Sequence, residues 1–76
     1  MGLLPRKEQD ILITSFERDY GKLIMECKNN NINKKSFEEN LYKLLEQIES
    51  MVNTDYFEDD NIEFLNCMSQ SIRIAA

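Results

Sequence analysis

The stretch SFEENLYKLLEQIESMV, residues 36–52, decides the fold because it has the pattern of an amphipathic helix. Its apolar residues recur at the i, i+3, i+4 spacing of one helical face: Phe37, Leu41, Leu44, Leu45, Ile48, Met51 and Val52. Polar residues fill the other positions, and Tyr42 stands at the boundary, where a ring can be half-buried. Ser36 and Glu39 form an S-x-x-E capping box. The sequence therefore predicts a helix over about residues 37–52 with Ser36 as its N-cap.

A longer helix is predicted before this stretch, over about residues 5–28. Pro5 suits a first helical position, where its missing N–H costs nothing. One face carries an apolar row: Leu12, Ile13, Phe16, Tyr20, Leu23, Ile24 and Cys27. A second capping box starts at Thr14, but the apolar row keeps its phase there, which favours one continuous helix. The run Asn29–Asn31 predicts a short turn, so the two helices should be antiparallel.

A third helix is predicted over about residues 61–74, after a loop at residues 53–60, NTDYFEDD. Asp60 is its expected N-cap. Its apolar face is Ile62, Leu65, Met68 and Ile72, extended by Ala75 and Ala76. The predicted fold is all-α, a three-helix bundle built on an antiparallel helical hairpin, with residues 1–76 as a single helical domain. A chain of 76 residues has a marginal core, which leaves open support from a homodimer or another partner.

Charge is distributed unevenly along the chain, whose formal net charge is −5. Residues 1–35 hold seven basic and five acidic residues, a net of +2, whereas residues 36–76 hold two basic and nine acidic residues, a net of −7. An acidic half repels nucleic acid and anionic lipid and attracts basic proteins. A helix-turn-helix DNA reader is excluded as well, because Arg73 is the only basic residue of the third predicted helix. Mimicry of DNA by the acidic face stays open.

The residue inventory argues against an enzyme, a metal centre and a cofactor site. The chain has no His and two separate Cys, which excludes His-based nucleophile arrangements and a structural zinc site. No glycine-rich phosphate loop is present. EF-hand loops that start at Asp55 or Asp59 fail, because Asp60 or Phe64 then stands where the turn needs Gly. Two lone thiols, no apolar membrane span and no address signal predict a cytoplasmic protein.

The loop between the second and third helices is the strongest binding candidate. Tyr56 and Phe57 are aromatic residues among acids, and such rings anchor protein interfaces while charges speed association. We expect Phe57 to join the core and Tyr56 to be partly exposed. A merely solvated surface fits the acids equally well. The predicted partner-binding face is Glu46, Glu49, Asp55, Tyr56, Glu58, Asp59, Asp60 and Glu63.

Four apolar residues lie off the main helical rows and support an alternative function. They are Ile11, Met25, Cys67 and Ile74. Scattered exposed apolar residues are normal, but a row of them in space would mark a dimer or partner surface. The alternative is therefore a structural or assembly protein that oligomerises through its apolar faces.

The segment YGKLIMECKNNNINKKSFEENLYKLLEQIE, residues 20–49, is similar to the helical hairpin of colicin D-type immunity proteins. The resemblance rests on an apolar helix, a short polar turn, Ile32, and the capped start Ser36-Phe37-Glu38. It implies a small acidic helical bundle that neutralises a basic ribonuclease toxin by covering its cleft. The leading hypothesis is accordingly an acidic inhibitor of a basic, nucleic-acid-acting protein, of the immunity, antitoxin or phage-inhibitor type.

Overall fold

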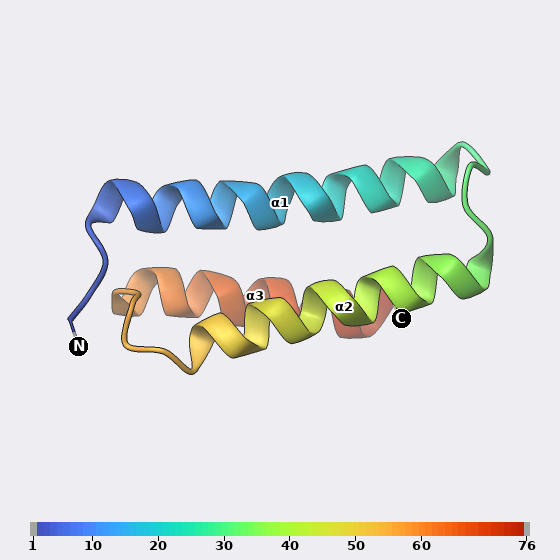
Figure 1. Ribbon diagram of the computed structural model, residues 1–76. Helices are drawn as coiled ribbons and strands as arrows, with labels where there is room; N and C mark the ends of the chain where they lie inside the picture. The colour runs from blue at the N-terminus through green and yellow to red at the C-terminus, as the bar shows by residue number, and fades with distance from the viewer. Residues whose placement is uncertain (1, 76) are drawn as a thin grey trace.

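The computed structural model describes residues 2–75, and within them it contains three helices and no strand. Helix α1 spans Arg6–Lys28, α2 spans Lys34–Val52 and α3 spans Asp59–Ala75. They form a three-helix bundle of about 41 × 19 × 16 Å (Figure 1). The all-α prediction is confirmed. The expectation for Ala76 lies outside the described residues.

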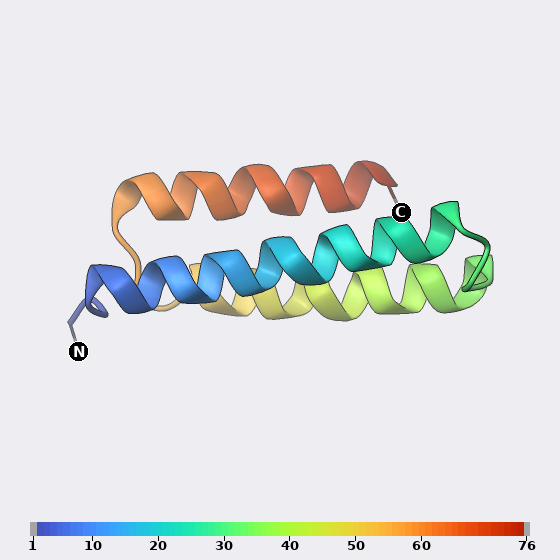
Figure 2. The same ribbon diagram turned by 90° about the horizontal axis from the view of Figure 1, so that it is seen from above.

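Helix α2 is the central element of the bundle. It runs antiparallel to α1 and to α3, so α1 and α3 point in the same direction (Figures 1 and 2). Both α1 and α3 pack extensively on α2 but make few contacts with each other. The hairpin of α1 and α2 also extends past the C-terminal end of α3 (Figure 2).

The predicted starts of the second and third helices are wrong by two to three residues. Asn33, not Ser36, caps α2: the Asn33 side-chain oxygen accepts the Ser36 backbone N–H at 2.8 Å. Asn is as good an N-cap residue as Ser. Because the N-cap is Asn33 instead of Ser36, α2 is about one turn longer than predicted. Helix α3 begins at Asp59, so Asp60 lies inside the helix instead of capping it. The Ile62 N–H donates to the Glu58 carbonyl at 2.9 Å, which closes the first turn of α3.

The core lies along α2 and receives the predicted apolar faces of all three helices. Its buried members are Ile13, Phe16, Leu41, Leu44, Leu45, Ile48, Phe57, Leu65, Met68 and Ile72. The expectations that Cys27 and Ala75 belong to the buried faces fail, because both residues are exposed. Cys27 is exposed, because the last turn of α1 extends beyond the cover of α3 (Figure 2). Tyr42, which was expected at the boundary of the buried face, is 56% exposed.

The connection between α1 and α2 is the predicted asparagine turn. Asn30 adopts the left-handed conformation with φ of 58°, which Asn tolerates better than most residues. The Asn31 N–H donates to the Glu26 carbonyl at 2.9 Å, and this bond closes the end of α1. Among the described residues, no helix combines the length and the apolar character needed to cross a membrane.

Candidate partner-binding face

The α2–α3 loop is held in place by its own contacts, so the groups it carries are positioned. Phe57 is 2% exposed and anchors the loop in the core, while Tyr56 is half-buried. Both placements confirm the expectations for the two rings. The Thr54 hydroxyl donates to the Met51 carbonyl at 2.7 Å, and the Leu4 N–H donates to the Tyr56 carbonyl at 2.9 Å. The segment before α1 is thereby tied to the loop.

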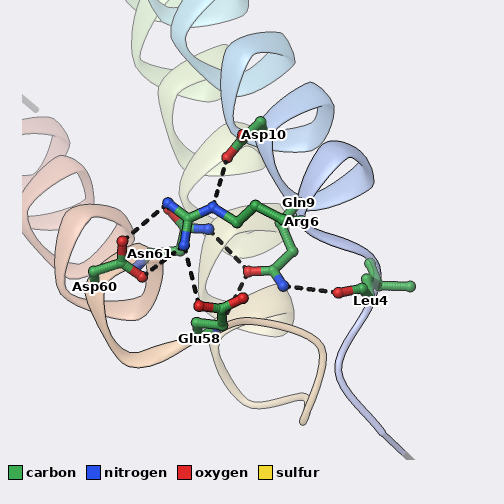
Figure 3. Close-up of polar contacts among 7 residues, drawn as sticks. All are labelled: Leu4, Arg6, Gln9, Asp10, Glu58, Asp60 and Asn61. Carbon is green, nitrogen blue, oxygen red and sulfur yellow. Dashed lines mark hydrogen bonds and ion pairs between the residues drawn. The ribbon is translucent and has the colours of Figure 1, made fainter.

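Arg6 at the start of α1 binds three carboxylates (Figure 3). Its guanidinium makes two hydrogen bonds to Asp60, at 2.9 and 3.0 Å. It also pairs with Glu58 at 3.2 Å and with Asp10 at 3.3 Å. Arg suits this role because its planar fork matches a carboxylate in a bidentate arrangement. The cluster could not be predicted from the sequence, since 52 residues separate Arg6 from Glu58 on the loop and 54 separate it from Asp60 on α3.

The Arg6 cluster shifts the protonation equilibria of its members. The hydrogen bond from Arg6 lowers the pKa of the Asp60 carboxyl below its ordinary value, and the backbone N–H of Asn61 lowers it further. The bond to Asp60 in turn raises the pKa of Arg6, so its charge is permanent. Both groups are exposed to solvent, and solvent screening keeps the contribution of such pairs small.

Removing Arg6 should make the protein less sensitive to acid. Because the pKa of Asp60 is lowered on folding, the stabilisation it provides is complete above the unfolded-state pKa and is lost as pH falls through the folded-state pKa. The urea midpoint of Arg6→Met should therefore lie below that of the wild type at about pH 7, and the gap should close at about pH 2. Lys22→Met is the control, since Lys22 is exposed on the same helix and makes no ion pair within residues 2–75. A gap for Arg6→Met that is constant with pH would contradict this assignment.

Gln9 forms a buried polar network beneath the Arg6 cluster (Figure 3). Its side chain is 0% exposed, and its Nε2 donates to the Leu4 carbonyl at 2.8 Å. Its Oε1 accepts from the Glu58 N–H at 3.0 Å and from Asn61 Nδ2 at 2.9 Å. This single amide therefore joins the segment before α1, the loop and the first turn of α3. Its i, i+3 and i, i+4 relations to Leu12 and Ile13 are the sequence signal that could have placed Gln9 on the buried face.

The structure divides the predicted face into paired and unpaired carboxylates. Glu58 and Asp60 are bound to Arg6, and Glu49 on α2 is bound to Arg73 on α3. Within residues 2–75, four exposed members make no ion pair: Glu46, Asp55, Asp59 and Glu63.

The predicted face is not one continuous cluster. Asp55, Tyr56, Glu58, Asp59 and Asp60 lie together along the loop and the start of α3, and Glu63 follows one turn later. Glu46 lies six residues before the end of α2, about 9 Å along the helix axis. The group near the loop is therefore the better candidate, and we call Asp55, Tyr56, Asp59 and Glu63 the acidic turn.

The unpaired carboxylates of the acidic turn can bind a cation-rich surface. Within the described part of the chain, no group of three or more His, Cys, Asp and Glu side chains is placed to hold a metal ion. Comparison of the chain with protein-family models, with curated proteins and with solved structures finds no match.

Proposed function

We propose that this protein is a non-catalytic cytoplasmic inhibitor that binds a basic, nucleic-acid-acting protein through its acidic turn and occludes the partner's site. The observation that carries the proposal is the set of unpaired carboxylates beside the half-buried ring of Tyr56. Unpaired carboxylates can take the place of substrate phosphates against Lys and Arg. Desolvation of the ring supplies binding energy that charge alone does not.

The rigidity of the loop supports this proposal. Because Phe57 is buried and Arg6 holds Glu58 and Asp60, the acidic turn is ordered before any partner arrives. Preorganisation lowers the entropic cost of binding. The excess negative charge would also speed encounter with a basic partner in a salt-dependent manner. The class of inhibitor is that implied by the resemblance of residues 20–49 to colicin D-type immunity proteins.

The first test is affinity capture of the tagged protein from its native cells, with elution by increasing salt. We expect one basic partner in near-stoichiometric amount, released as salt screens the charges. Recovery of only the protein itself would contradict the proposal and favour the alternative, assembly through the apolar faces.

The second test places the interface on the acidic turn. Asp55→Lys with Asp59→Lys should weaken binding to the captured partner by about tenfold or more and flatten its salt dependence. Asp60 is unsuitable for this test, since its loss would also release Arg6. The matched control is Glu38→Lys with Glu39→Lys at the other end of α2, which changes the net charge from −5 to −1 just as the test variant does. Equal weakening by both variants would show that net charge, not the acidic turn, determines affinity.

A further inference from the structure

A groove follows the line between α1 and α3, which run in the same direction (Figure 2). Both helices pack on α2 but make few contacts with each other, so the line between them is not closed. One hollow of about 330 Å³ has a lining that includes Tyr20 and Gly21 on α1 and Phe64 and Cys67 on α3. A second hollow of about 400 Å³ shares Glu17 and Phe64 with the first. We call the two hollows together the α1–α3 groove.

The α1–α3 groove is about three helical turns long. Its walls are residues 10–21 on α1 and residues 60–71 on α3. At a rise of about 1.5 Å per residue, each wall is about 17 Å long. The hydrogen bond from Asn61 Nδ2 to Gln9 Oε1 at 2.9 Å places the starts of the two walls at about the same height along the bundle. The groove therefore has room along its length for a segment of about 11 helical residues.

Buried and exposed apolar side chains both line the α1–α3 groove. Ile13 and Met68 are 7% and 8% exposed, whereas Phe64 on α3 is 42% exposed. Gly21 lies in the interior of α1, where Gly is less favourable than Ala. A Cβ at Gly21 would meet nothing within 4 Å, so the packing of the chain itself does not require a glycine there. Close approach of a partner's backbone to α1 does require one.

The charge of the α1–α3 groove is negative. Asp10, Glu17 and Asp60 line it, and no Lys or Arg of residues 2–75 lines either hollow. Glu17 is exposed and makes no ion pair within the same residues. Asp10 and Asp60 share Arg6 with Glu58, so one positive charge faces three negative charges and the Arg6 cluster keeps a net charge of −2. A ligand that carries positive charge beside an apolar surface is therefore complementary to the groove.

From these observations we infer that the α1–α3 groove binds a basic amphipathic helix of another protein. The apolar row of that helix packs on Tyr20, Phe64 and Met68, and its Lys or Arg side chains pair with Glu17 and the Arg6 cluster. A helix fits because both walls are helices whose backbone N–H and C=O groups are bonded internally, so the groove offers no edge to an extended chain. The groove includes no member of the acidic turn, so this inference does not rest on the proposed function.

A second copy of this chain is a poor occupant of the α1–α3 groove. The main apolar rows of its three helices are already used in its own core. None of these helices is basic, since α1 has equal numbers of basic and acidic residues, α2 has a net charge of −1 and α3 has a net charge of −2. Like charges in such contact oppose association. The complementary helix therefore belongs to a different protein.

Protection of Cys67 from alkylation tests this inference, because Cys67 lines the groove while Cys27, also exposed, lies outside both hollows and is an internal control. The probe is an amidated peptide of about 14 residues made of Leu and Lys, with Leu on one helical face. Mass spectrometry follows the reaction of each thiol of the full chain with N-ethylmaleimide. At about 0.5 mM peptide, alkylation should slow about tenfold at Cys67 and less than about twofold at Cys27. A scrambled peptide of the same composition, which has no apolar face, should not protect Cys67.

Two variants test whether the peptide lies in the groove. Gly21→Arg fills the first hollow and repels the peptide, so it should weaken peptide binding, measured by protection of Cys67, by about tenfold or more. The fold should tolerate this change, since the space at Gly21 is open and Arg is a better helix former than Gly. Ser50→Arg adds the same charge at an exposed position of α2 outside both hollows and is the matched control. Glu17→Gln should weaken binding several-fold, whereas Glu39→Gln, at an exposed position of α2, should not.

Three results would overturn the inference: no protection of Cys67, equal protection by the scrambled peptide, or equal effects of Gly21→Arg and Ser50→Arg. Alkylation of Cys67 that slows with rising protein concentration in the absence of peptide would identify a second copy as the occupant and would overturn it as well. The assay uses no captured partner, so its outcome is distinct from that of the inhibitor proposal.

Discussion

Gln9→Leu should lower the free energy of unfolding by about 3 kcal/mol, although the side chain keeps nearly the same volume. The wild-type amide satisfies the Leu4 carbonyl, the Glu58 N–H and the Asn61 side chain in a site that is 0% exposed. Leucine leaves these groups without a partner, and each buried orphan costs about 1–3 kcal/mol. Urea denaturation followed by circular dichroism measures the change.

A double variant separates the hydrogen bonds of Gln9 from its packing. Gln70→Leu, an exposed Gln on α3, is the control and should stay within about 0.5 kcal/mol of the wild type. Gln9→Leu/Asn61→Leu removes donor and acceptor together, so the combined loss should be smaller than the sum of the single losses. If the losses of unfolding free energy in the two single variants simply added up in the double variant, Gln9 and Asn61 would contribute to stability independently.

Leu41→Ala should destabilise the protein by about 3 kcal/mol, within the range of about 2–5 kcal/mol for buried Leu truncations. Leu41 is 0% exposed in the core, so truncation removes buried apolar surface and leaves a cavity. A domain of this length has a total stability of roughly 4–11 kcal/mol. The variant should therefore lose a large part of its stability and show a strongly reduced urea midpoint.

Tyr42→Ala is the matched control for Leu41→Ala, because it truncates the next residue of the same helix. Tyr42 is 56% exposed, so its loss should change stability by less than about 1 kcal/mol. Similar losses for both variants would contradict the orientation of α2.

Most of the fold could be predicted from the sequence because helical periodicity is a local property. The row from Phe37 to Val52 predicted the buried face of α2, and Phe57 was correctly assigned to the core. The helix starts were less predictable, since Asn33 and Ser36 are both good N-caps three residues apart. Cys27 follows the apolar spacing of α1, yet it is exposed because the end of the hairpin lies beyond α3.

The candidate site was only partly accessible to sequence reasoning. The acids around Tyr56 stand out as a local cluster, and this cluster is the basis of the acidic turn. The pairing of Glu49, Glu58 and Asp60 with arginines could not be foreseen, because Arg6 and Arg73 reach them only after the helices pack.

The sequence by itself determined the number of helices, the buried face of each and the excess of acid near the second turn, because these depend on spacings of a few residues. Tertiary structure alone decided which carboxylates are paired with arginine and that Gln9 is buried. The Arg6–Asp60 and Gln9–Asn61 contacts join residues more than 50 positions apart, and the Arg73–Glu49 contact joins residues 24 positions apart, so all three depend on how α1 and α3 pack on α2.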